Sequence, residues 1–314
     1  MLAMWQRSLS CAPIVSGLAL WFGQKNSFMK LAFLGLGVMG FPMAGHLQKA
    51  GHNVTVYNRN AEKSAKWVAM YGGLSAATAR EAALGADVVM MCVGNDNDVR
   101  SVINGADGAL AGLSADAVLV DHTTASADVA REVDAEAKKL GKHFIDAPVS
   151  GGQAGAENGK LTIMCGGEPA AFDKVKDVLA LYAKAVTLMG PSGAGQLTKM
   201  VNQICIAGLV QALSEGLAFA QKAGIDAKLV LDVISKGAAQ SWQMENRGTT
   251  MVDGKFDFGF AVDWMRKDLG ICLDEAKRNG ARLPVTALVD QFYADVQQAG
   301  GNRLDTSSLI TRLS

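Results

Sequence analysis

The residues near the start of the chain that could do chemistry form a glycine pattern of the type GxGxxG. Its six consecutive members are Gly35, Leu36, Gly37, Val38, Met39 and Gly40. A strand-like run, 30–34, precedes them and a helix-like segment, 41–50, follows. In that setting the first glycine permits a tight turn, the second lets the main chain approach a pyrophosphate, and the third lets the helix pack closely on the sheet. The pattern predicts a dinucleotide-binding turn with phosphates at the helix N-terminus, and the alternative is an ordinary glycine-rich turn.

The residues that follow the next expected strand indicate which dinucleotide would bind. Asn58 and Arg59 stand directly after the apolar run 54–57. An acidic residue at this place usually bonds the ribose 2′-hydroxyl of NAD, whereas an arginine attracts the 2′-phosphate of NADP. We therefore expect NADP as the cofactor, with NAD possible. The alternative is that Arg59 is only a solvated turn residue.

A lysine in an otherwise apolar helical segment is the candidate catalytic residue. Asn202 and Gln203 follow Lys199 by three and four positions, so all three side chains share one helix face. A lysine ammonium can polarise a carbonyl group and donate a proton to its oxygen as a hydride reaches the carbon. Desolvation and a nearby cation lower a lysine pKa, which helps the amine act in both directions. The alternative is a solvated face with a snorkelling lysine.

A third segment has the chemistry of an anion site. Ser150, Gly151 and Gly152 come after a strand-like run and the rigid Pro148. A hydroxyl group beside bare main-chain N–H groups suits a substrate carboxylate. The alternative is a flexible connection.

Two different patterns of elements must position these residues. Up to about residue 190, apolar strand-like runs alternate with amphipathic helical segments, which predicts a mostly parallel sheet covered on both faces. The expected strands are 31–34, 54–57, 88–93, 117–120, 144–145, 161–165 and 186–189, the last two or three with the short connections of antiparallel additions. After the breaker cluster 191–195 we expect only helices, at 196–223, 227–236, 262–279 and 285–299.

The predicted fold class is therefore α/β, with an N-terminal Rossmann-type doubly wound parallel sheet followed by an all-α C-terminal domain. We expect a dinucleotide-binding domain at 29–192 and a helical substrate and oligomerisation domain at 193–314. Residues 1–28 contain no acidic residue, and their apolar core, 12–22, is too short to span a bilayer. We expect an unstructured leader or a misassigned start there, rather than a targeting signal.

Composition narrows the class of partner. The chain has 314 residues, 49% of them hydrophobic and 19% charged, with a formal net charge of +0. The missing basic surplus argues against nucleic acid, and no membrane partner is expected. Cys92, Cys165 and Cys205 lie in apolar runs and suggest buried, reduced thiols of a cytoplasmic protein. Scattered cysteines and histidines predict no metal site.

The segment 35–47, GLGVMGFPMAGHL, closely resembles the opening signature of the β-hydroxyacid dehydrogenases. This family includes 3-hydroxyisobutyrate dehydrogenase, tartronate semialdehyde reductase (2-hydroxy-3-oxopropionate reductase) and the succinic semialdehyde or glyoxylate reductases. Three more segments resemble the family in order. They are its substrate-binding segment at 146–152 (DAPVSGG), its catalytic segment at 193–203 (GAGQLTKMVNQ) and its cofactor-contacting KDL at 267–269.

The resemblance implies further site residues. Val93 and Asn95 stand in the family's cofactor-contacting loop, where Gly94 replaces the usual proline. Thr124 would approach the nicotinamide ribose or carboxamide, and Lys267 would lie near the cofactor. Ser241, before Trp242, would edge the substrate pocket. His122 departs from the family pattern, and we expect it to be a packing residue.

The resemblance also implies an NAD(P)-dependent dehydrogenase or reductase that transfers a hydride between NAD(P)H and a small carboxylate-bearing β-hydroxyacid or semialdehyde. The Asn58–Arg59 pair favours an NADPH-dependent reductase of the tartronate, succinic or glyoxylic kind. The alternatives are an NAD-dependent 3-hydroxyisobutyrate dehydrogenase and a non-catalytic NADP-binding partner module, which could dispense with Lys199. 6-Phosphogluconate dehydrogenase has a much longer helical domain, and imine reductases lack the lysine. A homodimer or homotetramer is expected.

Overall fold

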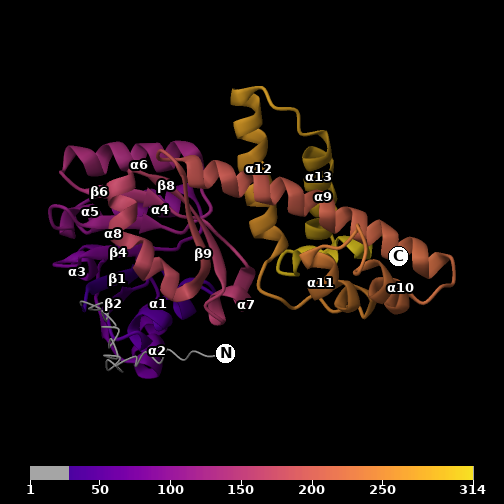
Figure 1. Ribbon diagram of the computed structural model, residues 1–314, viewed down its shortest axis with the longest axis horizontal. Coiled ribbons are helices and arrows are strands. Elements are labelled where there is room, and N and C mark those ends of the chain that lie inside the picture. The colour runs from indigo at the N-terminus through magenta and orange to yellow at the C-terminus, as the bar shows by residue number, and fades with distance from the viewer. Residues whose placement is uncertain (1–27, 314) are drawn as a thin grey trace, which may run out of the picture.

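The computed structural model describes residues 28–313, so nearly all of the expected leader lies outside the described residues. The described chain has an α/β part followed by a helical part, and one long helix leads from the first into the second (Figure 1). The predicted fold class is confirmed.

The first part is built on one sheet in the strand order β3-β2-β1-β4-β5-β6-β8-β7, with β9 also paired to β8. The pairs from β3 to β6 are all parallel, whereas β6 and β7 run antiparallel to β8. β9 is parallel to β8 and therefore also runs antiparallel to the strands from β1 to β6, so the expected antiparallel additions are observed at this end of the sheet. The strands are β1 (Lys30–Leu34), β2 (Asn53–Tyr57), β3 (Leu74–Ser75), β4 (Val88–Met91), β5 (Val118–Asp121), β6 (His143–Asp146), β7 (Val149–Ser150), β8 (Leu161–Gly167) and β9 (Ala183–Gly190).

Helices cover both faces of this sheet because successive strand residues point to opposite sides. In β1, Leu31 and Phe33 pack into one hydrophobic core with α1, α2 and α8, while Ala32 and Leu34 pack into the other with α3 to α6. The helical segments of this part are α1 (Gly40–Lys49), α2 (Ala61–Tyr71), α3 (Ala79–Ala83), α4 (Asp96–Ile103), α5 (Ala109–Gly112), α6 (Ala127–Lys139), α7 (Gly152–Glu157), α8 (Pro169–Leu179) and the 3₁₀ segment η1 (Ala180–Tyr182).

The second part contains no strand within residues 191–313, apart from an isolated bridge between Ala261 and Asp305. Its hydrophobic cores lie where the other helices pack against α9, the longest helix of this part. The helical segments are α9 (Ala194–Lys222), α10 (Ala227–Ile234), α11 (Trp242–Val252), α12 (Val262–Asn279), α13 (Pro284–Gln298) and the 3₁₀ segment η2 (Thr306–Leu313).

α9 is the one helix within residues 28–313 that is long and apolar enough to cross a membrane, judged by length and composition alone. In its most apolar stretch 44% of the residues are buried, and it contacts β8, α11, α12, α13 and η2. This packing accounts for its apolar composition. Cys205 lies on the exposed side of α9, so its expected burial was wrong, whereas Cys165 is buried.

Two helical segments of the second part, α11 and η2, were not expected from the sequence. α11 contains Gly248 and two threonines, which are weak helix formers. The helix forms because Ser241 caps its N-terminus and because Met244 and Met251 are buried in the core that α9 and α10 share. Tertiary packing therefore supplies what the local sequence lacks.

Candidate active site

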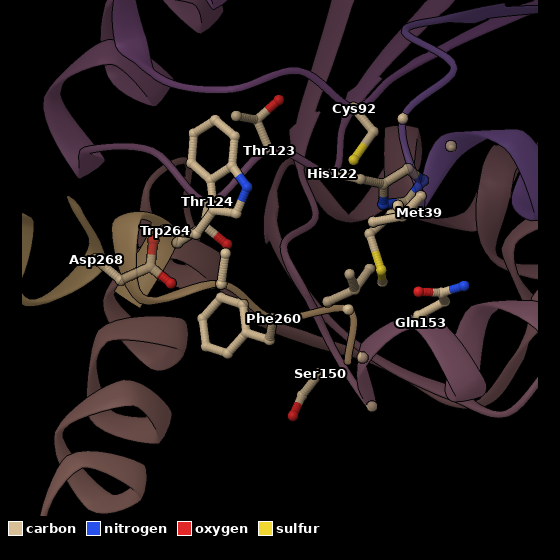
Figure 2. A pocket seen from close by; sticks show the side chains of 18 of the residues that line it. Met39, Cys92, His122, Thr123, Thr124, Ser150, Gln153, Phe260, Trp264 and Asp268 are labelled. Atoms are coloured by element: carbon tan, nitrogen blue, oxygen red, sulfur yellow. The ribbon is translucent and has the colours of Figure 1, made fainter. Parts of the chain in front are cut away.

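A cavity of about 1170 Å³ lies where the α/β part and the helical part meet. Its walls come from the loops that follow β1, β2, β4 and β5, from the β7–α7 segment, and from α9, α11 and α12. Figure 2 shows Thr124, Trp264 and Asp268 on one side of the cavity, and Met39 and His122 on the other. The cavity therefore brings together segments far apart in the sequence.

The glycine turn forms one end of the cavity. Gly35 has a φ of +96°, which a side chain would disfavour, and its N–H donates to the Tyr57 carbonyl at 2.8 Å. A Cβ at Gly40 would collide with the carbonyl oxygen of Gly35 and lie 2.9 Å from Phe33 Cε1. A Cβ at Gly37 would meet nothing within 4 Å, and Gly37 lines the cavity. Gly35 and Gly40 therefore shape the turn, while Gly37 leaves room beside it.

This turn suits a dinucleotide phosphate. α1 begins at Gly40 without a side-chain cap, because Met39 precedes it, so its first N–H groups have no side-chain acceptor. An unfilled space beside Gly37 and the positive end of the α1 dipole suit a pyrophosphate, although Phe41 N–H already donates to the Gly37 carbonyl at 3.0 Å and Pro42 has no N–H. The residues present therefore fit the expected cofactor.

The end of β2 lies beside the glycine turn. The Asn58 side chain accepts from Leu36 N–H at 2.9 Å and donates to the Asn60 carbonyl at 3.0 Å, so both ends of its amide are engaged. Arg59 lines the cavity and forms an ion pair with Asp98, with Nη1 3.0 Å from Oδ1. Lys63 lines the same end. Two cations and one carboxylate thus face this end of the cavity.

Lys199 lies in the second turn of α9 and is only 7% exposed, yet it lines the cavity. Burial lowers the pKa of its ammonium to about 8, against the opposing effect of Asp268 and with the help of Lys267. Within residues 28–313 this ammonium forms no hydrogen bond or ion pair. A buried amine with free donors and a pKa near neutrality can transfer a proton in either direction.

Hydrogen bonds connect the polar groups around Lys199. The Ser150 hydroxyl donates to Asn202 at 3.3 Å, the Asn202 amide donates to Gln203 at 2.7 Å, and Gln203 donates to Asp268 at 2.7 Å. Asp268 Oδ1 lies 2.9 Å from Lys267 Nζ, its neighbour in the sequence. The chain of contacts links the Ser150–Gly152 segment to α9 and α12.

Lys267 connects this hydrogen-bond network on α12 to the α/β part. Its ammonium donates to the carbonyl oxygen of Thr124, and it lies 5.9 Å from the ring centre of Trp264. Both Thr124 and Lys267 line the cavity. α12 is therefore tied to the loop that follows β5.

The N-terminus of α9 is anchored to the sheet by Asp146, the last residue of β6. The Asp146 carboxylate accepts from Gly193 N–H at 2.7 Å and from Gln196 N–H at 2.9 Å. Burial raises the pKa of this carboxyl to about 6, although these donors favour its charged form. A Cβ at Gly195 would lie 2.8 Å from the Asp146 carbonyl oxygen, so only glycine permits this approach. The anchor sets where Lys199 enters the cavity.

His122 is a packing residue, as expected. Its Nδ1 lies 2.7 Å from the Ala147 carbonyl oxygen and therefore carries the proton, so Nε2 accepts from the Tyr182 hydroxyl at 2.8 Å. Burial lowers the pKa of His122 to about 4, and both ring nitrogens are occupied. The ring is thus held neutral in the cavity wall.

Most of the predicted site residues line the cavity, but three do not. The cavity is lined by Gly35, Gly37, Val38, Met39, Gly40, Asn58, Arg59, Val93, Thr124, Ser150, Gly151, Gly152, Lys199, Asn202, Gln203 and Lys267. The side chain of Leu36 is buried in the core, Asn95 accepts from Asp98 N–H as the cap of α4, and Ser241 accepts from Met244 N–H as the cap of α11. Trp242, next to Ser241, does line the cavity.

Sequence reasoning missed Gln196, Phe260 and Arg247. Gln196 stands three residues before Lys199 on the same helix face, and this spacing was a usable signal. Phe260 and Arg247 line the cavity from the helical part, and no local pattern marks them. Among residues 28–313, no group of three His, Cys, Asp or Glu side chains is arranged to hold a metal ion.

Two family models together match nearly the whole described chain. One, described as the NAD binding domain of 6-phosphogluconate dehydrogenase, matches residues 30–190. The other, described as the NAD-binding of NADP-dependent 3-hydroxyisobutyrate dehydrogenase, matches residues 193–313. The chain belongs to the 3-hydroxyisobutyrate dehydrogenase family. The resemblance of its four motifs to the β-hydroxyacid dehydrogenases is confirmed.

Relatives in the 3-hydroxyisobutyrate dehydrogenase family match over nearly their whole length. An uncharacterized oxidoreductase of Shewanella frigidimarina is 66% identical over 284 residues, which cover 90% of this chain and 98% of that protein. The 2-hydroxy-3-oxopropionate reductase of Escherichia coli is 36% identical over 287 residues, which cover 91% of this chain and 97% of that protein. The structure of 3-hydroxyisobutyrate dehydrogenase from Mycobacterium tuberculosis with L-serine has a TM-score of 0.83 at 32% identity, covering 91% and 99%.

Membership in the 3-hydroxyisobutyrate dehydrogenase family makes this protein an NAD(P)-dependent dehydrogenase that acts on CH–OH groups. The enzyme is thereby favoured over a non-catalytic NADP-binding module. The relatives carry different substrate names, so membership assigns a class of small hydroxyacids and no single compound.

Proposed function

We propose that this enzyme is an NADPH-dependent reductase of a short carboxylate-bearing semialdehyde, of the tartronate, succinic or glyoxylic kind, with Lys199 as the proton-transfer residue. One observation carries the proposal. A buried lysine with free N–H donors and a pKa lowered by burial to about 8 lines the same cavity as the glycine turn.

Lys199 acts on the carbonyl oxygen of the substrate. The nicotinamide, when bound, supplies or accepts the hydride. The Lys199 ammonium polarises the carbonyl and donates a proton to its oxygen, becomes a neutral amine, and regains a proton from water. In the oxidative direction the neutral amine accepts the proton of the substrate hydroxyl. A pKa near 8 leaves both forms accessible close to neutral pH.

Ser150, Gly151 and Gly152 bind the substrate carboxylate. All three line the cavity, and the Ser150 hydroxyl lies 3.3 Å from Asn202 Oδ1, which connects the carboxylate site to the helix that carries Lys199. The main-chain N–H groups of Gly151 and Gly152 fit a carboxylate, and the Ser150 hydroxyl becomes a further donor once its proton turns away from Asn202. Asn202 and Gln203 orient the substrate from α9, and their mutual hydrogen bond of 2.7 Å restricts both amides.

Arg59 and Lys63 support NADPH as the cofactor, because both are cations at the end of the cavity where this fold reads the ribose 2′-group. The ion pair of Arg59 with Asp98 favours the second candidate, NAD-dependent 3-hydroxyisobutyrate dehydrogenase, because the arginine already has an anionic partner. Turnover with each cofactor separates the two.

The two parts of the chain have different roles in this proposal. Residues 29–192 bind the dinucleotide, and residues 193–314 complete the substrate site and form homodimer or homotetramer contacts in a cytoplasmic enzyme. Exposed apolar side chains on α9 and α10, such as Phe219, Leu229 and Val233, support self-association. Light scattering of the purified protein would reveal a monomer if this part of the proposal is wrong.

A spectrophotometric screen tests the function. NADPH and NADH oxidation at 340 nm are followed with tartronate semialdehyde, succinic semialdehyde, glyoxylate and methylmalonate semialdehyde, for the wild type, Lys199→Ala and Lys222→Ala. Lys222 is a matched control because it is an exposed lysine at the end of the same helix. We expect Lys199→Ala to lower kcat by at least about 10²-fold with unchanged cofactor affinity. Nearly unchanged kcat in this variant would remove Lys199 from its role.

A further inference from the structure

The ion pair between Arg59 and Asp98 joins two loops on either side of the glycine turn. Arg59 follows β2, and Asp98 lies in the first turn of α4, which follows β4. In the sheet, β1 stands between β2 and β4, and the glycine turn continues from β1. The pair therefore bridges the cavity across the end of β1, and both residues line the cavity.

The Arg59 side chain is mobile enough to exchange Asp98 for another anion, whereas Asp98 is held in position near the start of α4. The Arg59 side chain is 75% exposed and the Asp98 side chain 20%. An exposed ion pair of this kind stabilises the fold by only about 0–1 kcal/mol, so breaking it is easy. Asp98 is fixed by its place in the first turn of α4, where the helix dipole favours a carboxylate.

Gly94 gives the Asp98 carboxylate its place. A Cβ at Gly94 would collide with Asp98 Oδ2, so no residue with a side chain can stand there while Asp98 keeps this position. Glycine at this place, where the family usually has proline, thus leaves room for the Asp98 carboxylate in the position observed. Gly94 and Asp98 act as one local arrangement that brings a negative charge towards Arg59.

The neighbouring Asn58 carries no charge, so it cannot replace Arg59 as the cationic partner of a 2′-phosphate. Both ends of its side-chain amide are engaged, by Leu36 N–H at 2.9 Å and by the Asn60 carbonyl at 3.0 Å. The 2′-group of a bound dinucleotide would therefore be read by Arg59, with Lys63 as the second cation.

We propose that Asp98 is a cofactor-selecting residue that competes with the 2′-phosphate of NADP(H) for Arg59. This inference rests on the dinucleotide site of the proposed function. A 2′-hydroxyl leaves the ion pair intact. A 2′-phosphate takes Arg59 from Asp98 and leaves an unpaired carboxylate beside a second anion, which opposes NADP(H) binding. Selectivity thus arises from one attractive and one repulsive group, and it keeps NAD(H) usable.

The test measures binding of nucleotide fragments by calorimetry, without turnover. Adenosine 2′,5′-bisphosphate and 5′-AMP differ only in the 2′-phosphate. We expect Asp98→Asn to tighten the bisphosphate by about tenfold and to leave 5′-AMP within about twofold, a selectivity change of about 1.4 kcal/mol. Asp107→Asn is the matched control, because it removes an exposed carboxylate elsewhere in the α/β part and should change neither Kd.

A double variant tests whether Asp98 acts through Arg59. In an Arg59→Leu background the Asp98→Asn substitution should tighten the bisphosphate by much less than tenfold, because only the relief of direct repulsion by Asp98 remains. Equal tightening of both nucleotides, or an undiminished effect without Arg59, would overturn the proposal. Because the readout is binding, it remains informative even if no semialdehyde is reduced and the proposed function fails.

Discussion

The side-chain amide of Gln196 donates a hydrogen bond of 2.8 Å to the main-chain carbonyl of Thr123. The same side chain accepts from Ala125 N–H at 3.1 Å, so one residue of α9 satisfies two main-chain polar groups of the loop after β5. Thr124, between these two contacts, lines the cavity. Gln196 therefore positions Lys199, one helical turn later, against this loop.

Replacing Gln196 with Leu should disturb catalysis more than binding. It leaves the Thr123 carbonyl and the Ala125 N–H buried without partners, which costs about 1–3 kcal/mol of stability. We expect kcat to fall by about tenfold or more, while the Kd of NADPH stays within about twofold. Gln211→Leu is the control, because Gln211 is also buried on α9 but donates to Glu215 of the same helix. Equal losses of kcat in both variants would contradict a positioning role.

The pH dependence of turnover should report the Lys199 ammonium, whose pKa burial lowers to about 8. Reduction needs the protonated form, so kcat for a semialdehyde should fall above about pH 8, approaching tenfold per pH unit. Oxidation needs the neutral amine and should rise up to about pH 8 and then level off. The Lys199→Arg variant should have a low kcat that does not change with pH across this range, because arginine stays protonated. Parallel pH profiles for the two directions would argue against Lys199.

Lys199 should also lower the stability of the fold at neutral pH. Its pKa falls from 10.5 to about 8 on folding, so between these values the unfolded chain holds a proton that the folded protein has released. Stability therefore rises with pH through this window, and below about pH 8 the buried charge costs on the order of 1–3 kcal/mol. We expect Lys199→Met to raise the Tm at pH 7, and the gain to disappear near pH 10.5. Lys222→Met should leave the Tm unchanged; a Tm decrease in Lys199→Met would refute the prediction.

Two of the three glycines of the turn, Gly37 and Gly40, should respond differently to alanine. At Gly40 a Cβ collides with the Gly35 carbonyl oxygen, so Gly40→Ala should lower the Tm even without cofactor. At Gly37 the space is open, so Gly37→Ala should keep the wild-type Tm and weaken NADPH binding by about tenfold or more, because the pyrophosphate needs that space. Thermal unfolding and fluorescence titration check both. A destabilised Gly37→Ala with normal NADPH affinity would be the opposite result.

Local patterns were enough to predict the strands near the glycine turn, α9 and α12. α12 runs from Val262 to Asn279, as expected, because its apolar spacing and Gly280 at its end are both sequence signals. β7 was not predicted, since two residues, Val149 and Ser150, form no recognisable period. Elements that owe their form to packing, such as α11, have no equally clear signal.

In the site, the residue types were predictable but their partners were not. Lys199 and Ser150 could be identified from short motifs. The bonds from Asp146 to Gly193 and from Lys267 to Thr124 join residues 47 and 143 positions apart, and no spacing rule reaches that far. Ser241 shows the opposite error, because a serine before a helix is as often a cap as a ligand.

α9 is anchored by Asp146 at its first turn, so a rotation of the helix about this contact would move Lys199 much less than the far end of the helix. Lys199 stands about 8 Å along the axis from Ala194, whereas Lys222 stands about 42 Å from it, at 1.5 Å per residue. A swing of about 5° around the Asp146 contact would move the far end by nearly 4 Å but Lys199 by less than 1 Å. A shift of several ångströms at the far end of α9 would therefore leave Lys199 almost in place beside the cavity.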